Sequence, residues 1–241
     1  MLPNYDMDAL ILAAGRGTRM GNIDKPKCLL DIGGITMIDY QINCFKNNGI
    51  NQIFVVTGYN SEMIREHVTE QVTYIQNNDY ASTNNLYSLW VANEVMNDDF
   101  VCVYGDLFFD KQILQNCIND NNNVCLVLER KIRNETMKAR ISNNYVTEVN
   151  KLIPMELANG NFIGMAKFKK QIIPLLFKEI SKLINDGNYN SYYTDAIESM
   201  IKNGSKINYV ETNNLSWLDV DEKYEFEEAK KIYQKITETD P

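Results

Sequence analysis

The fold prediction starts from Leu10-Ile11-Leu12-Ala13-Ala14-Gly15-Arg16-Gly17-Thr18-Arg19-Met20-Gly21, followed closely by Lys25-Pro26-Lys27. The apolar run that begins at Ala9 and ends at Ala14 is typical of a buried strand. The three glycines let the backbone adopt positive φ and approach a ligand closely, and such a turn points consecutive N–H groups into one concavity. Four positive charges fall within twelve residues, at Arg16, Arg19, Lys25 and Lys27. We therefore expect a polyanion such as a phosphate chain to bind at the end of this strand.

Two common phosphate-binding motifs do not match this stretch. A P-loop needs Gly-Lys-Ser/Thr after a first glycine and four further residues, and the dinucleotide fingerprint needs a glycine where Met20 stands. Leu-Ala-Ala-Gly-x-Gly-Thr-Arg-Met followed by Pro-Lys-x-Leu-Leu instead resembles the signature of the sugar-nucleotide-type nucleotidyltransferases. These enzymes join a nucleoside triphosphate to a phosphorylated acceptor and release pyrophosphate. A basic glycine turn that merely caps a strand is the alternative interpretation.

The composition narrows the class of protein. With 241 residues and no linker rich in Pro, Gly or Ser, the chain is expected to form one domain. A net charge of −8 argues against nucleic acid or an anionic membrane as the main partner, and no apolar run approaches the length of a membrane span. The five cysteines include no Cys-x-x-Cys pair, and the single histidine, His67, has no metal ligands clustered around it. We therefore expect reduced, buried thiols in a cytoplasmic protein, and neither a zinc site nor a Ser-His-Asp triad.

Apolar strands alternate with segments of helical periodicity along the rest of the chain. This pattern is typical of a parallel α/β sheet with right-handed crossovers. Strands are predicted at 9–14, 53–58, 72–75, 100–106, 124–128, 162–168 and 207–210, with a hairpin at 138–141 and 145–149. Helices are predicted at 35–48, at 61–68 with Ser61 as the N-cap, from an Asn-rich loop to about 95, at 110–119, 170–185 and 191–202, and after 221.

A second motif, Thr83-Asn84-Asn85-Leu86-Tyr87-Ser88-Leu89, opens one of these helices. Its residues are suited simply to capping a helix, but an amide presents a donor and an acceptor together, as recognition of a base edge requires. The motif resembles the base-contacting loop of one branch of the family, the cytidylyltransferases that act on phosphocholine and related small acceptors. The resemblance covers essentially the whole chain. It implies a single-domain, Rossmann-like nucleotidyltransferase fold of the α/β class, with a mixed, mostly parallel sheet flanked by helices. Residues 1–110 would form the nucleotide-binding half and residues 111–241 the acceptor-facing half.

Carboxylates in two further segments are suited to a metal ion. Gly105-Asp106 ends a buried strand, and ligands of open α/β sheets lie beyond the carboxyl ends of the strands. Alternation places Trp217, Asp219 and Asp221 on one face of a later segment, although Asp221 is equally suited to capping the helix that follows. Hard carboxylate oxygens suit Mg²⁺ beside phosphates. The resemblance implies that Asp106, with Asp219 or Asp221, binds a catalytic Mg²⁺, or Mn²⁺ in its place.

The sequence indicates the residues that would bind the acceptor less specifically than those that would bind the nucleotide. Charged residues on the predicted hairpin are positioned either to meet an acceptor phosphate or to form a solvated face. Aromatic residues before and at the start of a late helix, and near the second carboxylate segment, would attract a quaternary ammonium together with a nearby carboxylate, although tyrosines at a helix start often only pack. The predicted acceptor contacts are Glu129, Lys138, Lys151, Tyr193, Asp195 and Trp217.

The motifs together predict an enzyme whose substrates are CTP and a small phosphorylated acceptor. Phosphocholine, phosphoethanolamine, aminoethylphosphonate and phosphoglutamine are the candidate acceptors, and the resemblance also implies a role in surface polysaccharide biosynthesis. The acceptor oxygen would attack the α-phosphorus of CTP in line, with catalysis by positioning and charge neutralisation. The alternatives are a sugar-1-phosphate nucleotidyltransferase on the same fold and a catalytically inactive nucleotide-binding regulator. The motifs imply nothing about oligomeric state.

The individual roles follow from the position of each motif. Arg16, Arg19 and the loop N–H groups would hold the β- and γ-phosphates, and Lys27 would neutralise the charge that builds on the α-phosphate. The predicted catalytic residues are Arg19, Lys27 and Asp106. The predicted nucleotide contacts are Leu12, Ala13, Ala14, Gly15, Arg16, Gly17, Thr18, Thr83, Asn84, Asn85, Ser88 and Gly105.

Overall fold

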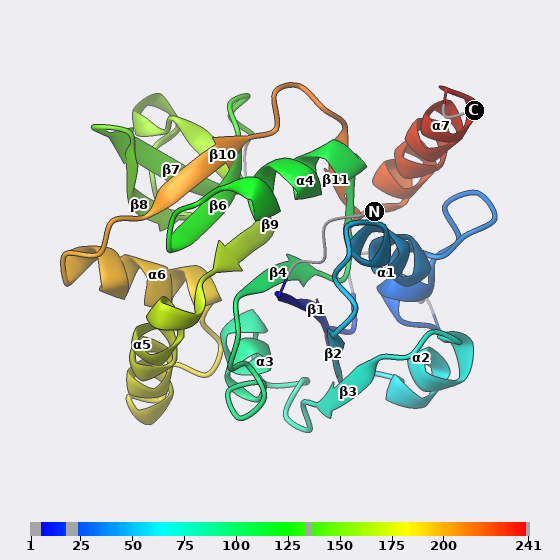
Figure 1. The fold of residues 1–241 in the computed structure, drawn as a ribbon, viewed down its shortest axis with the longest axis horizontal. Coiled ribbons are helices and arrows are strands. Elements are labelled where there is room, and N and C mark those ends of the chain that lie inside the picture. The colour runs from blue at the N-terminus through cyan, green and yellow to red at the C-terminus, as the bar shows by residue number, and fades with distance from the viewer. Residues whose placement is uncertain (1–5, 18–23, 134–135, 240–241) are drawn as a thin grey trace.

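A mixed sheet lies at the centre of the computed structural model, which describes residues 6–17, 24–133 and 136–239 (Figure 1). Nine of the described strands form this sheet, and seven of them lie in one row in the order β10-β6-β9-β4-β1-β2-β3. Neighbours in the row are parallel except where β9 lies antiparallel between β6 and β4. The strands of the row are β1 (Asp8–Ala13), β2 (Ile53–Thr57), β3 (Thr73–Gln76), β4 (Phe100–Tyr104), β6 (Val124–Glu129), β9 (Gly160–Phe168) and β10 (Asn208–Glu211).

Two antiparallel pieces extend this row. The predicted hairpin forms from β7 (Met137–Ser142) and β8 (Tyr145–Asn150), and β7 also pairs with β9. A separate two-stranded sheet joins β5 (Leu107–Phe109) to β11 (Trp217–Asp219). Because β5 begins three residues after β4 ends, this small sheet places β11 beside the carboxyl end of the central sheet.

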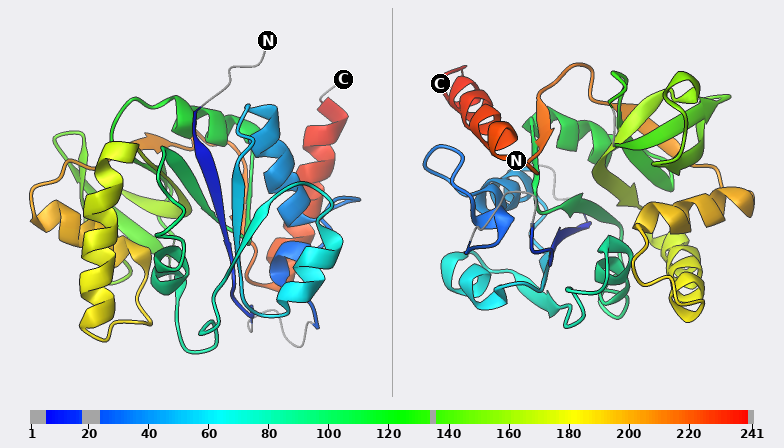
Figure 2. Two further views of the ribbon diagram at one scale, coloured as in Figure 1. Left: turned by 60° about the horizontal axis from the view of Figure 1, so that its bottom comes forward. Right: turned by 180° about the vertical axis from the view of Figure 1, so that it is seen from behind.

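Helices cover both faces of the sheet, and each face has its own apolar core (Figure 2). One core receives buried residues from α1, α2, α4 and α7, and the other from α3, α5 and α6. Alternation along β1 divides its side chains between the two cores, since Ala9 and Ile11 belong to the first and Leu10 and Leu12 to the second. The helices are α1 (Met37–Asn47), α2 (Ser61–His67), α3 (Asn85–Trp90), α4 (Lys111–Asn119), α5 (Ile173–Asn185), α6 (Tyr193–Lys202) and α7 (Lys223–Thr239).

The predicted fold class, an α/β domain with a mostly parallel mixed sheet flanked by helices, is confirmed. Several predicted helix ends differ from the structure, and two of the differences have a clear local cause. Asn60, with a left-handed φ of 46°, is the N-cap of α2, and Ser61 is the first helical residue. The helix α3 ends at Trp90 and not near Val95, because the backbone beyond it tightens into turns in which Ala92 donates to Leu89 at 3.1 Å.

The cysteines agree with an expectation from composition. All five cysteines are buried free thiols. In the ranges that the structure describes, none of the helices combines the length and the apolar character that crossing a bilayer would require.

Gly164, in the middle of β9, provides a test of the packing beside the cavity described below. Its φ is +92°, and a Cβ built there would lie 2.4 Å from the ring of Tyr104. We expect Gly164→Ala to lower the free energy of unfolding by about 3 kcal/mol, because backbone strain and overpacking add. Gly204 is the matched control, with φ +89° and open space around the same position, so Gly204→Ala should cost only about 1 kcal/mol. Equal losses for the two variants, measured by urea denaturation, would show that the Tyr104 contact adds nothing.

Candidate active site

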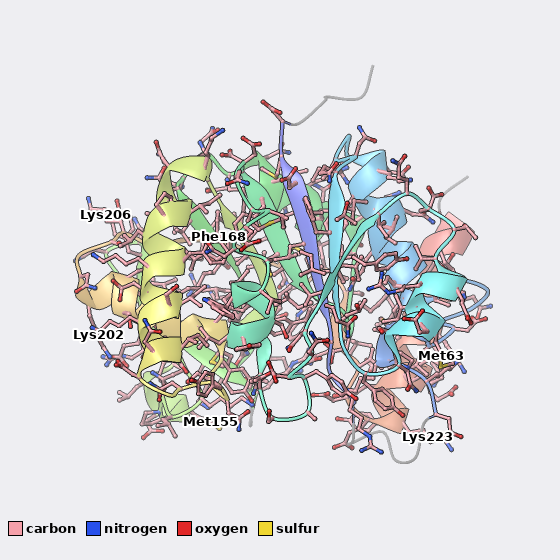
Figure 3. The ribbon with its side chains drawn as sticks, turned by 90° about the horizontal axis from the view of Figure 1, so that it is seen from below. Met63, Met155, Phe168, Lys202, Lys206 and Lys223 are labelled. Atoms are coloured by element: carbon pink, nitrogen blue, oxygen red, sulfur yellow. The ribbon has the colours of Figure 1, made fainter. Side chains whose placement is uncertain are left out.

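A cavity of about 590 Å³ lies at the carboxyl ends of β1 and β4, the edge at which open α/β sheets bind ligands. The loop after β1, the segment at Lys27 and the start of α3 form one part of its wall, and segments from the end of β4 to the start of α7 form the rest. Met155 and Lys223 lie along this edge of the molecule, toward which β1 runs (Figure 3). Both halves of the chain therefore contribute to one site.

Lys27 reaches the cavity from a short 3₁₀ helix, Lys27–Leu29, that follows Pro26. Its aliphatic stem packs against Gly17, which has a φ of +66° and whose Cβ, if present, would lie 2.5 Å from the Lys27 Cε. Position 17 therefore requires glycine for two reasons: its φ is positive, and the Lys27 side chain lies too close to leave room for a Cβ. Gly15 has neither a positive φ nor a crowded neighbour, so the expected left-handed conformation is absent there.

Three carboxylates converge on the end of Lys27. Asp106 lies between β4 and β5, and Asp219 ends β11, the strand that pairs with β5. The Val220 N–H donates to the Asp106 carbonyl at 3.0 Å and fixes the two segments side by side. The Lys27 Nζ lies 3.3 Å from Asp106 Oδ2 and also donates to Asp221 Oδ1. One ammonium thus connects the segment after β1 to the residue two positions beyond β11.

These charges shift the pKa values of the cluster. Burial lowers the pKa of Lys27, but the carboxylates of Asp106 and Asp221 outweigh burial and raise it above its ordinary value. Burial raises the pKa of Asp106, the Lys27 ammonium opposes that rise, and the Asp221 carboxylate adds to it. Lys27 is therefore charged, and a further cation would stabilise the ionised carboxylates.

The carboxylate cluster fits a magnesium ion. One oxygen from each of Asp106, Asp219 and Asp221 lies within 4.8 Å of the others. Mg²⁺ takes hard oxygen ligands and is bound by one or two carboxylates together with substrate phosphates. Alternation in the sequence does not decide whether Asp219 or Asp221 is the second metal ligand. The structure brings both side chains into the cluster.

The wall opposite this cluster includes the start of α3. The side-chain oxygen of Asn84, the N-cap, accepts the Asn85 N–H at 2.8 Å, and the Asn85 oxygen accepts the Tyr193 N–H at 2.8 Å. Both amides are therefore held in fixed orientations. The predicted nucleotide contacts that line the cavity are Leu12, Ala13, Ala14, Gly15, Gly17, Thr83, Asn84, Asn85, Ser88 and Gly105.

The other residues predicted around the glycine loop are Arg16, Thr18 and Arg19. Arg16 is exposed, and its guanidinium lies 5.4 Å from the centre of the Tyr59 ring, outside the described lining of the cavity. Thr18 and Arg19 lie outside the described residues.

Only two of the predicted acceptor contacts, Lys151 and Trp217, line the cavity. The structure corrects the expectation for Glu129, Lys138, Tyr193 and Asp195, which are not among the described lining residues. Each of these four instead supports the wall or packs in a helix.

The contacts of these four residues explain their positions. Tyr193 is wholly buried, with its ring against other aromatic rings, and Tyr192 lines the cavity in its place. Lys138 is buried and donates to the Lys151 carbonyl at 2.7 Å. Asp195 is half-buried in the first turn of α6, where burial raises its pKa. Glu129 is also buried, and it holds a residue of the wall, as shown below.

Several cavity residues were not predicted from the sequence. Tyr192 belongs to the tyrosine group that the sequence singles out, but adjacent residues at a helix start point in different directions, and only the structure decides which one faces the cavity. Arg133 lies in an irregular loop that carries no periodic signal. The unpredicted lining residues include Cys28, Tyr80, Tyr104, Arg133, Thr136, Met137, Phe162, Ile163, Tyr192, Glu222, Tyr224 and Glu225.

Comparisons with known proteins agree with this geometry. A model of the MobA-like NTP transferase domain matches residues 9–154. The CTP:phosphoglutamine cytidylyltransferase of Campylobacter jejuni subsp. jejuni serotype O:2 is 26% identical, over 89% of this chain and 96% of that protein. Bifunctional GlmU proteins are further relatives, and the chain spans only about half of their length.

Solved structures share the fold. A CTP:phosphocholine cytidylyltransferase from Streptococcus pneumoniae superposes with a TM-score of 0.76 at 23% identity, over 94% of this chain and 99% of that chain. A putative glucose-1-phosphate thymidylyltransferase from Bacillus anthracis superposes with a TM-score of 0.77 at 21% identity, over 94% of each chain.

Proposed function

The chain belongs to the MobA-like NTP transferase domain family, and we propose that it is a Mg²⁺-dependent cytidylyltransferase. In this proposal it transfers CMP from CTP to a small phosphorylated acceptor and releases pyrophosphate. The observation that carries the proposal is the cluster of Lys27 with Asp106, Asp219 and Asp221 in a cavity whose wall also holds the fixed amides of α3. The similarity to a CTP:phosphoglutamine cytidylyltransferase over nearly the whole chain supports it.

The reaction is a single displacement. An oxygen of the acceptor phosphate or phosphonate attacks the α-phosphorus of CTP, and the new P–O bond forms as the bond to the β-phosphate oxygen breaks. The electron pair of the broken bond leaves with pyrophosphate, and no covalent enzyme intermediate is needed when both substrates are bound together. Lys27 neutralises the charge that develops on the α-phosphate. Arg19 and the N–H groups of the glycine loop hold the β- and γ-phosphates in this proposal, and Arg16 would have to leave the Tyr59 ring to join them.

Asp106, with Asp219 or Asp221, would hold the magnesium ion of this proposal. When bound, the ion supplies positive charge to the phosphate oxygens around the reacting phosphorus. The position of Lys27 between two of these carboxylates keeps its ammonium directed at the same point.

The preference for cytosine rests on the amides of α3. Because the oxygens of Asn84 and Asn85 accept backbone N–H groups, each side chain presents its NH₂ group as a donor. Cytosine offers two adjacent acceptors on its pairing edge, where uracil offers an acceptor beside a donor. Two amide donors therefore favour CTP over UTP.

The test is a pyrophosphate-release screen of the full chain with Mg²⁺, crossing four nucleoside triphosphates with a panel of acceptors. The panel contains phosphocholine, phosphoethanolamine, aminoethylphosphonate, phosphoglutamine and glucose 1-phosphate. We expect CTP to be the best nucleotide and a nitrogen-containing acceptor to give the highest kcat/KM. If glucose 1-phosphate gave the highest value, the enzyme would be a sugar-1-phosphate nucleotidyltransferase. Binding of CTP without pyrophosphate release from any pair would identify an inactive regulator.

A further inference from the structure

Two cations in the cavity lie apart from the Lys27 cluster and have no role in the mechanism above. Arg133 and Lys151 both line the cavity. The Arg133 guanidinium lies 4.5 Å from the centre of the Trp217 ring, and the Lys151 ammonium lies 4.6 Å from the centre of the Tyr192 ring. Lys151 also donates to the Tyr192 hydroxyl at 2.8 Å.

The Trp217 ring is a fixed platform for Arg133. Its Nε1 donates to Glu129 Oε2 at 3.0 Å, and the same oxygen accepts the Thr212 hydroxyl at 3.1 Å. The other oxygen of Glu129 accepts the Lys131 N–H at 3.0 Å. Glu129 is 8% exposed and Trp217 6% exposed, so this contact is buried and the ring cannot turn without breaking it. A guanidinium stacked on such a ring keeps its planar edge available for hydrogen bonds.

The charges of this wall favour an anion. Within the residues that the structure describes, neither Arg133 nor Lys151 forms an ion pair with a carboxylate. The described acidic residues of the cavity are those of the metal cluster and two at the start of α7, namely Asp106, Asp219, Asp221, Glu222 and Glu225. Two cations in a concave site attract an anionic ligand group.

The position of Trp217 decides which part of the acceptor Arg133 meets. Trp217 precedes Asp219 by two residues on β11, which corresponds to about 7 Å along a strand. The reacting phosphate of the acceptor must lie at the Asp219 end, beside the α-phosphate of CTP. Arg133 contacts the Trp217 ring and therefore belongs to the Trp217 end of this strand, where the far end of a small acceptor would lie.

We propose that Arg133, on the Trp217 platform, binds a carboxylate at the far end of the acceptor, so that the acceptor is a phosphorylated amino acid. This proposal rests on the cytidylyltransferase function above. At this end of the cavity the rings of Trp217 and Tyr192 are already covered by the cations of Arg133 and Lys151, so neither ring favours a quaternary ammonium. Phosphocholine would therefore meet like charges, whereas a carboxylate would form charge-assisted and bidentate hydrogen bonds with the guanidinium.

Two matched pairs of compounds isolate the carboxylate. O-phosphoserine differs from phosphoethanolamine, and phosphonoalanine from aminoethylphosphonate, only by a carboxylate group. Binding of all four to the full chain is measured by calorimetry in the presence of α,β-methylene-CTP, which occupies the nucleotide site without reacting. We expect the carboxylate member of at least one pair to bind about tenfold more tightly or better. No preference in either pair, no binding by either carboxylate compound, or tighter binding of phosphocholine would overturn the proposal.

Variants assign the preference to Arg133. Arg133→Leu should bring the carboxylate preference close to one and leave binding of the carboxylate-free members unchanged, and Arg133→Lys should give an intermediate preference. Arg140→Leu is the control, because Arg140 pairs with Glu148 on the hairpin at 2.7 Å and is not part of the described cavity lining. If Arg133→Leu weakened both members of a pair equally, Arg133 would bind the phosphate and the proposal would be wrong. A carboxylate preference in binding without pyrophosphate release in the screen would instead refute the proposed function.

Discussion

Asp106→Asn is expected to lower kcat for pyrophosphate release by about a hundredfold or more, with the fold intact. The change removes one of three carboxylates that lie within 4.8 Å of one another, and with it the charge that would bind the metal at the α-phosphate. The protein should still fold because Asp106 lies at a strand end, and because Lys27 keeps its contact with Asp221. The rate is measured with CTP and the best acceptor of the screen, across a range of Mg²⁺ concentrations.

Asp98→Asn is the matched control for this variant. Asp98 is a half-exposed carboxylate that pairs with Lys170 at 2.7 Å, away from the cavity lining. The same loss of charge there should change kcat by less than about twofold, since exposed ion pairs contribute little. A near-normal rate of Asp106→Asn at saturating Mg²⁺ would remove Asp106 from the mechanism.

Lys27→Ala is expected to lower kcat by about a hundredfold, or roughly 3 kcal/mol, and to change the KM for CTP much less. The reason is that the ammonium is most useful as the α-phosphorus gains its fifth oxygen, so the lost interaction belongs to the transition state. Burial of the residue to 8% exposure and its two carboxylate contacts fix the position of the Lys27 side chain before substrates bind. Steady-state kinetics with varied CTP separate the two effects.

The neighbouring lysine provides the comparison for Lys27→Ala. Lys25 lies on the other side of Pro26 and is not among the described residues of the cavity wall, so Lys25→Ala should retain most of the activity. A pure effect of Lys27→Ala on KM would assign Lys27 to ground-state binding. A larger loss of activity from Lys25→Ala than from Lys27→Ala would mean that Lys25, and not Lys27, is the lysine that acts on the α-phosphate.

Local patterns in the sequence predicted the geometry of the glycine loop and of the carboxylate cluster well. The apolar run before the first glycine loop forms β1, Gly17 has its positive φ, and the alternation that grouped Asp219 with Asp221 brings both to Asp106. These features depend on short-range geometry, namely strand alternation and the conformational freedom of glycine. Sequence can therefore specify them without knowledge of distant contacts.

The part of the cavity around Trp217 and Tyr192 was predicted poorly because its residues meet through long-range contacts. Glu129 carries no local sign that it holds Trp217, which is 88 residues away. Tyr193 and Tyr192 have the same side-chain chemistry, and only the packing of α6 against the sheet decides that one is in the core and the other in the cavity wall. Arg133 is positioned by the Trp217 ring, and no local pattern in the sequence indicates this contact.

The contact between Lys27 and Asp221 also has a consequence for biosynthesis. It joins residues 194 positions apart, whereas β1, β2, β3 and β4 all lie within the first 104 residues. A nascent chain can therefore pair these four strands while later segments are still being translated. The carboxylates of β11 and its flank reach Lys27 only after that strand has left the ribosome. Each newly made molecule is thus expected to stay catalytically silent until β11 has emerged, and translation products that stop short of β11 should never gain activity.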